Sequence, residues 1–290
     1  MMNPLLKKCS ISLFCCMLLS ESTHAQYQYT QSDSLKIVRW QQESRHLPKE
    51  KQLLFFAHKL LHTPYKAGTL EINDPEQVII NLRHLDCTTY VETVLALTLS
   101  VRSTQPSFRL FCQNIERLRY RNGKNCGYIS RLHYFSDWIA DNEHKKLVTE
   151  IGISPSDVFD GTRLSDISYM SSHPTSYTAL QKHPDWIPSI REQEKKLSGQ
   201  QVFYISRQTI CNNPPAMRNI LHDGDILATV TNVKGLDVAH LGIAKWKNGR
   251  LHWYNASRIY KKVVCDPKTL CEYLHKNPRI AGIRIIRLND

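Results

Sequence analysis

The chain has 290 residues, of which 41% are hydrophobic and 22% are charged. This composition supplies enough apolar side chains for the core of one large domain or two small ones, and it excludes a globally disordered chain. The formal net charge of +12 at pH 7 favours acidic partners.

The first segment has the three parts of a secretory signal. Lys7 and Lys8 form a basic start, residues 11–19 are a short apolar run, and Ala25 offers a small side chain at a cleavage point. The run is shorter than the roughly 20 apolar residues that span a bilayer. We therefore predict a signal peptide at residues 1–25 and a periplasmic or secreted mature protein without stable membrane insertion.

Removing this segment takes away Lys7, Lys8 and Glu21, so the formal charge becomes +11, from 12 − 2 + 1. Nucleic acid is an acidic partner, but export argues against it. Peptidoglycan fits better, because its stem peptides carry free carboxylates. We predict muropeptides as partners, no nucleic acid, and a monomeric protein.

Six cysteines remain after the predicted cleavage, and an even number in an oxidising compartment permits disulfides. Their connectivity cannot be deduced from the sequence. These cysteines are Cys87, Cys112, Cys126, Cys211, Cys265 and Cys271.

Helical patterns dominate the first half of the chain. One predicted helix begins at Pro48 and ends before Thr63-Pro64, because the residue before proline avoids helical angles. A second runs from about Asp86 to Ser100, with apolar residues at helical spacing. Residues 101–200 are mixed, and we expect them to form an inserted substrate-groove region within a single catalytic domain at 26–290.

The C-terminal third has the short alternating segments of β-strands, separated by turn residues. Helices first and strands last predict an α+β domain with a segregated antiparallel sheet. The predicted strands are Val202–Ile205, Ile226–Val230, Leu241–Trp246, Leu251–Tyr254 and Ile280–Leu288.

Cys87 is a candidate nucleophile because it stands at the start of the second helix, after the potential capping residue Asp86. A thiolate is the attacking species in a cysteine hydrolase, and a helix N-terminus stabilises its negative charge. We therefore expect a lowered pKa at Cys87. A lone cysteine at such a position is, however, more often a small buried hydrophobe.

His240 and Asn255 are candidates for the base and the residue that orients it. Lys247-Asn248-Gly249 is a hairpin turn signal, and folding there brings Asn255 to within about two residues of the point opposite His240. An asparagine beside one imidazole nitrogen fixes the tautomer of the ring. Cys87, His240 and Asn255 thus form a predicted triad.

The ordered motifs resemble the NlpC-type, papain-like cell-wall peptidases, from about residue 35 to 290. They are similar above all to the branch of N-acetylmuramoyl-L-alanine amidases first catalogued as a domain of unknown function. At position 255 that branch usually carries histidine, so Asn255 is a departure. The motifs are Tyr65, Asp86-Cys87, Gly224-Asp225-Ile226, His240-Leu241-Gly242-Ile243 and Asn255-Ala256-Ser257, together with the stretches 64–71, 130–138 and 234–240.

The resemblance implies a papain-like fold, with a helical part that carries the cysteine, a central insertion and a C-terminal sheet that carries the histidine. It implies cleavage of the amide between N-acetylmuramic acid and L-alanine, without metal or cofactor. Oxyanion and substrate-binding roles are assigned to a wider set. The spacing of Leu132, Phe135 and Trp138 predicts a helix in which these three residues are largely core, with Arg131 and His133 on its other face. The set is Tyr65, Asp86, Arg131, His133, Tyr134, Trp138, Ser171 and Ser172.

The sequence is also compatible with three other functions. A γ-D-glutamyl-diaminopimelate endopeptidase would use the same triad on the same substrate. A non-catalytic wall-binding module would not depend on Cys87. A lipid acyltransferase of related fold would need an apolar surface beside the site.

Overall fold

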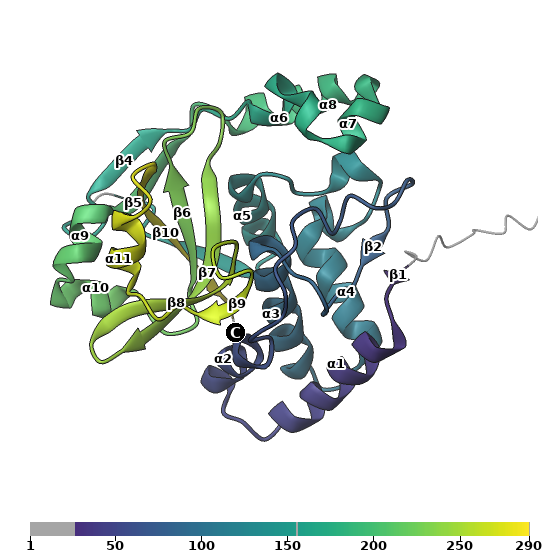
Figure 1. Cartoon of the computed structure of the whole chain (residues 1–290), viewed down its shortest axis with the longest axis horizontal. Coiled ribbons are helices and arrows are strands. Elements are labelled where there is room, and N and C mark those ends of the chain that lie inside the picture. Colours follow the sequence, from purple (N-terminus) through teal and green to yellow (C-terminus); the bar gives the residue numbers. More distant parts are fainter. Residues whose placement is uncertain (1–26, 155, 290) are drawn as a thin grey trace, which may run out of the picture.

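The computed structural model describes residues 27–154 and 156–289. The predicted signal peptide therefore lies outside the described residues. The structure is a mixed α+β fold in which a helical part and a large antiparallel sheet lie side by side (Figure 1). This confirms the predicted class and the antiparallel sheet.

The helical part forms from the first half of the chain, shown in purple to teal in Figure 1. Two short strands, β1 (Tyr27–Gln28) and β2 (Val78–Ile79), pair in parallel beside it. Its helices are α1 (Gln31–Ser44), α2 (Lys49–Lys59), α3 (Cys87–Val101), α4 (Phe108–Arg119) and α5 (Phe135–His144).

The large sheet has the strand order β4-β5-β10-β6-β7-β8-β9, with β3 paired to β10, and all of its pairings are antiparallel. Three of its strands were not predicted: β3, β4 and β9. The strands are β3 (Val148–Ile151), β4 (Gly161–Leu164), β5 (Gln201–Ser206), β6 (Ile226–Thr231), β7 (Val238–Lys247), β8 (Arg250–Ser257), β9 (Lys262–Cys265) and β10 (Ile280–Leu288).

Both faces of the sheet are covered, because successive side chains of a strand point to opposite faces. Ile226 and Ala228 of β6 belong to the main core with the helical part, whereas Leu227 between them packs on the other side. That other side is covered by α9 (Arg207–Asn212), α10 (Pro215–Ile220) and α11 (Leu270–His275).

Residues 101–200 are divided between several parts of the fold. Helices α4 and α5 pack into the main core, and β3 and β4 join the large sheet. A separate small core holds the remaining helices, α6 (Tyr169–Ser172), α7 (Thr178–Lys182) and α8 (Ile187–Leu197), at the top of Figure 1. In the described part of the chain, every helix is too short or too polar to cross a bilayer.

Candidate active site

Cys87 is the first residue of α3, as predicted. Asp86 caps this helix, because its Oδ1 accepts the backbone N–H of Thr89 at 2.8 Å, and Thr89 Oγ1 in turn accepts the N–H of Asp86 at 2.9 Å. The cysteine is a free thiol, half-buried against the main core. The cap thus fixes where the helix begins and hence where the sulfur lies.

The Cys87 pKa differs from the expectation of a lowered value. Burial, and then the negative charge of Asp86, raise the pKa of Cys87 to about 12. The backbone N–H groups of Leu241 and Thr88 and the Thr88 side chain hydrogen-bond the sulfur and oppose this rise, but they do not outweigh it. In the substrate-free protein Cys87 is therefore a neutral thiol at neutral pH, and its activation requires a base.

The hairpin of β7 and β8 forms at the predicted turn. Asn248 and Gly249 have φ angles of 50° and 70°, as a two-residue type I′ turn requires. Ile243 pairs with Tyr254, so one further step of this register sets Asn255 opposite Gly242, two residues from His240. The predicted geometry is thus present in the structure.

Asn255 and His240 are in direct contact across the hairpin. The Oδ1 atom of Asn255 lies 3.1 Å from His240 Nε2. When Nε2 donates this hydrogen bond, Nδ1 is the unprotonated nitrogen. Asn255 is almost fully buried, and its Nδ2 atom has no hydrogen-bond partner within the described chain.

Gly242 makes the close approach of the two strands possible. A Cβ atom at this position would lie 2.6 Å from the Trp253 ring and 2.8 Å from the carbonyl oxygen of Tyr254. Any side chain here would therefore push apart the strands that hold His240 and Asn255 together.

A β-bulge next to His240 was not predicted. Thr229 pairs with His240, but the next residue, Val230, pairs with Val238, so Ala239 is an extra residue in β7. A bulge bends its strand and redirects the neighbouring side chains. Ala239 and His240 both line the cavities at Cys87.

Two aromatic side chains surround the His240 ring. Trp253 contacts it edge-on, with ring centroids 5.3 Å apart, and Tyr273 of α11 stacks over it at 6.3 Å. Burial lowers the pKa of His240, while the hydrogen bond to Asn255 and the charge of Asp86 raise it by less. The imidazole is therefore neutral at neutral pH and able to accept a proton.

Three adjoining cavities form a groove along Cys87 and His240. The central cavity, of about 200 Å³, is lined by Cys87, His240 and Tyr177. The Arg258 cavity, of about 530 Å³, shares Cys87 and His240 with it. The Arg131 cavity, of about 650 Å³, adjoins the central cavity through shared lining residues such as Tyr177. Cys87 thus lies between the two larger cavities.

Tyr65 lines the Arg258 cavity together with Cys87. Burial and the neighbouring Cys87 and Asp86 raise the pKa of Tyr65, so its hydroxyl keeps its proton. The structure therefore places the predicted oxyanion donor beside the predicted nucleophile.

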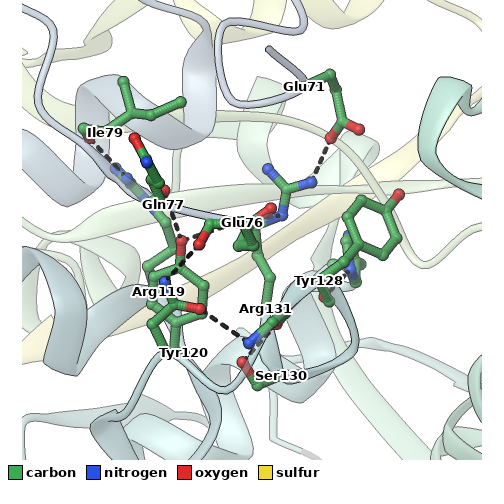
Figure 2. A network of polar contacts seen from close by, with 12 residues as sticks. Glu71, Glu76, Gln77, Ile79, Arg119, Tyr120, Tyr128, Ser130 and Arg131 are labelled. Carbon is green, nitrogen blue, oxygen red and sulfur yellow. Dashed lines mark hydrogen bonds and ion pairs between the residues drawn. The ribbon is translucent and has the colours of Figure 1, made fainter. Parts of the chain in front are cut away.

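Arg131 is engaged by carboxylates of the protein itself (Figure 2). Its guanidinium pairs with Glu71 and lies 3.6 Å from Glu76 through Nε, and it stacks on the ring of Tyr128. Only 4% of Arg131 is exposed. Its side chain lines the Arg131 cavity, but its charge is already balanced.

The expectation that Arg131 and His133 lie on a helix face was wrong, because α5 begins only at Phe135. His133 lies in the preceding segment, where its Nε2 is 2.9 Å from the carbonyl oxygen of Tyr128. Burial and the charge of Arg131 lower the pKa of His133 to about 3. A neutral His133 lines both the central and the Arg131 cavities.

Tyr134 and Trp138 belong chiefly to the protein interior. Tyr134 donates to Glu194 at 2.7 Å and accepts the N–H of Met170 at 2.8 Å, so it ties α5 to α6 and α8. Trp138 is 1% exposed and stacks on Phe135. The core role expected for Trp138 is confirmed. Tyr134 and Trp138 also form part of the wall of the central cavity.

Ser171 and Ser172 lie in α6 and line none of the three cavities. The backbone N–H of Ser171 instead donates to Glu194 at 3.0 Å. The groove is lined further along the chain by Ser176 and Tyr177.

Other residues near the groove were not predicted as site residues from the sequence. Arg258 directly follows the Asn255-Ala256-Ser257 motif, so its position was accessible from the register of β8. Tyr273 had no local signal, because α11 reaches His240 only through the fold. Asp237 accepts the N–H of Ser136 at 2.6 Å and so fixes the loop before His240 to α5.

One group of side chains, Cys211, Cys271 and His275, has atoms close enough to hold a metal ion. Its two sulfurs form a disulfide that joins α9 to α11. In this state they are not thiolate ligands. None of these three residues lines the groove.

Comparison with known proteins identifies the family. The sequence model of the AmiA-like, N-acetylmuramoyl-L-alanine amidase-like family matches residues 55–283. The chain belongs to this family. Membership places it among amidase-like hydrolases of the bacterial cell wall. No curated protein matches the chain.

Solved structures are similar to this amidase-like protein over most of its length. A crystal structure of an N-acetylmuramoyl-L-alanine amidase from Bacteroides uniformis is 38% identical, covers 83% of this chain and 99% of its own, and has a TM-score of 0.76. A proposed xylanase from Bacteroides fragilis is also 38% identical, over 80% of this chain and 99% of its own, with a TM-score of 0.74.

A Legionella pneumophila protein of the family DUF1460 shares the fold at 23% identity. It covers 89% of this chain and 95% of its own, with a TM-score of 0.69. The placement in the wider NlpC-type, papain-like group stays a prediction.

Proposed function

We propose that the protein is an exported cysteine amidase that cleaves the bond between N-acetylmuramic acid and L-alanine in peptidoglycan fragments. The observation that carries this proposal concerns β7. His240 of this strand contacts Asn255, and the next residue of the same strand, Leu241, hydrogen-bonds the Cys87 sulfur. Family membership supplies the substrate class, and the amidase from Bacteroides uniformis supplies the bond.

In the proposed first step, Cys87 attacks the lactyl carbonyl carbon and its thiol proton passes to His240. The tetrahedral intermediate then expels the amine of L-alanine, which takes the proton from His240, and a thioester to Cys87 remains. Water attacks the thioester with His240 again as base. The cysteine sulfur leaves and takes the proton back from His240, and the lactyl acid that forms loses its remaining proton to solvent.

The neutral resting state of both groups is compatible with this sequence of steps. Attack and proton transfer occur together, so no thiolate–imidazolium pair needs to exist before substrate binds. The backbone N–H of Cys87 at the helix start and the Tyr65 hydroxyl are the proposed donors to the oxyanion. Asn255 stabilises the imidazolium that forms, through its oxygen.

Mass spectrometry of digested muropeptides tests the proposal. Purified residues 26–290 should convert a disaccharide peptide into the free disaccharide and the intact stem peptide, and iodoacetamide should stop the reaction. A shortened peptide still attached to the sugar would instead establish the γ-D-glutamyl-diaminopimelate endopeptidase. The expected loss in Cys87→Ala distinguishes an enzyme from a wall-binding module, and activity that persists in this variant would overturn the assignment.

The xylanase description of one structural neighbour does not favour a glycosidase here. Such enzymes need two carboxyl groups on opposite sides of the scissile bond. Four carboxylates line the groove, three in the Arg131 cavity and Asp237 in the central cavity, but each has another role. Asp86 caps α3, Glu92 pairs with Arg119 at 2.7 Å, and Glu71 pairs with Arg131.

A further inference from the structure

The two larger cavities beside Cys87 differ in the charges that they offer to a ligand. The Arg258 cavity carries three cationic side chains, and among the described residues that line it none is acidic. The Arg131 cavity carries two arginines and three carboxylates. A substrate that extends to both sides of Cys87 therefore meets a cationic wall on one side only.

The two arginines of the Arg258 cavity are free to bind a ligand. Within the described chain neither Arg258 nor Arg279 forms an ion pair, and both are exposed to solvent. Arg258 is close enough to Tyr65 for its charge to affect that hydroxyl. In the Arg131 cavity, by contrast, Arg119 and Arg131 are almost fully buried and paired with glutamates.

The two sides of the scissile bond differ in charge in the same way. The sugar side of the scissile bond is uncharged until the lactyl carboxylate is released. The stem peptide carries the α-carboxylate of D-glutamate and the carboxylates of the residues beyond it. Planar guanidinium groups bind carboxylates through paired hydrogen bonds.

We propose that Arg258 and Arg279 form the stem-peptide subsite, which orients the substrate with its anionic peptide in the Arg258 cavity and its sugar toward the central and Arg131 cavities. This inference rests on the proposed function for its substrate. It adds the direction in which the substrate lies across Cys87 and names two residues that determine specificity for an acidic peptide.

The polar walls of the remaining groove suit an uncharged sugar. Tyr177 lines both the central and the Arg131 cavities, and Ser176 and Thr178 line the second of them. Aromatic faces and hydroxyl groups are the common contacts of sugar rings, through packing and hydrogen bonds. The cationic cavity therefore matches the anionic stem peptide, and the polar cavities match the uncharged sugar.

Two substrates that differ only in one negative charge test the subsite. One is a disaccharide attached to L-alanyl-γ-D-glutamyl-diaminopimelate, and the other is its analogue with the D-glutamate α-carboxyl amidated. The wild-type protein should favour the acid about tenfold in kcat/KM, and Arg258→Gln and Arg279→Gln should each reduce this preference, mainly through KM. The exposed Arg191→Gln of α8 is the matched control and should keep the full preference.

Binding of the free tripeptide L-alanyl-γ-D-glutamyl-diaminopimelate separates this inference from the proposed function. Calorimetry should show that the tripeptide binds to the Cys87→Ala variant. The affinity should fall about tenfold in the double variant Cys87→Ala, Arg258→Gln, and it should also fall as the salt concentration rises. Binding without turnover by the wild type would refute the amidase and keep the subsite. Turnover without any preference for the acid, or unchanged tripeptide binding in the double variant, would refute the subsite and keep the amidase.

Discussion

The start of α3 and the β7–β8 hairpin each supply one part of the candidate site, but they are held in place differently. Helix α3 is buried on nearly all sides and packs against α2, α4 and the sheet. The hairpin depends on a two-residue turn, a register and one hydrogen bond between His240 and Asn255. The position of the proposed nucleophile, Cys87, is therefore a property of the whole core, whereas the pairing of His240 with Asn255 is set within the hairpin.

The largest expected effect lies in the hairpin. Replacing His240 with alanine removes the proposed base, and kcat should fall by about 10²- to 10⁴-fold because the thiol stays protonated. Initial rates on a disaccharide peptide measure this loss. The exposed Arg250→Gln of the same hairpin should retain wild-type rates. A His240→Ala protein with more than a tenth of the wild-type rate would contradict the role of the base.

The second effect concerns stability and belongs to α3. Glu92→Gln leaves the buried guanidinium of Arg119 without its charge partner, and we expect the free energy of unfolding to fall by about 3–5 kcal/mol. The matched control is Glu43→Gln, which breaks the more exposed pair with Lys59 and should cost less than about 1 kcal/mol. Urea unfolding of both variants measures the difference. Equal losses would show that α3 is not held by its buried pair.

The third effect returns to the hairpin. Asn255→Ala removes one hydrogen bond to a ring that becomes charged in the proposed reaction, which is worth about 1.5–3 kcal/mol, or about 10- to 150-fold in kcat. Asn255→His should recover part of the activity, because an imidazole can also accept the His240 N–H. Steady-state kinetics distinguish these variants. Wild-type rates in Asn255→Ala would remove the residue from the triad.

The smallest effect is a pH dependence that compares the two parts directly. Burial lowers the pKa of His240, so kcat/KM should rise with pH through an apparent pKa below the usual 6.5. Burial also raises the pKa of Cys87 to about 12, so alkylation by iodoacetamide should accelerate with pH throughout the neutral and alkaline range. A fast alkylation rate that is constant from pH 5 to 8 would indicate a preformed ion pair and would contradict both shifts.

The hairpin was predictable because its signals are local. Asn248-Gly249 specifies the turn, and the turn fixes the register that brings Asn255 to His240. The capping residue Asp86 likewise predicted the start of α3. These elements require no knowledge of distant parts of the chain.

The remaining features depend on contacts between distant segments. Helix α1 was missed because few of its residues are apolar, and Leu35 and Val38 among them are exposed. The raised pKa of Cys87 reflects its burial in the assembled core, which outweighs the helix start. Arg131 was expected to face substrate, but Glu71 and Glu76 come from a segment about 60 residues earlier. No periodicity in the sequence reports such pairings.

The disulfide between Cys211 and Cys271 affects how the protein must be handled. It anchors α11, whose Tyr273 stacks over the ring of His240. A strong reductant keeps the Cys87 thiol intact, but it also opens this bond and so removes the covalent link between α9 and the helix that contacts His240. The form that the proposed function requires is thus a mixed redox state, with Cys211 and Cys271 joined and Cys87 reduced. Purification without dithiothreitol, followed by brief mild reduction and a thiol count, is the suitable preparation.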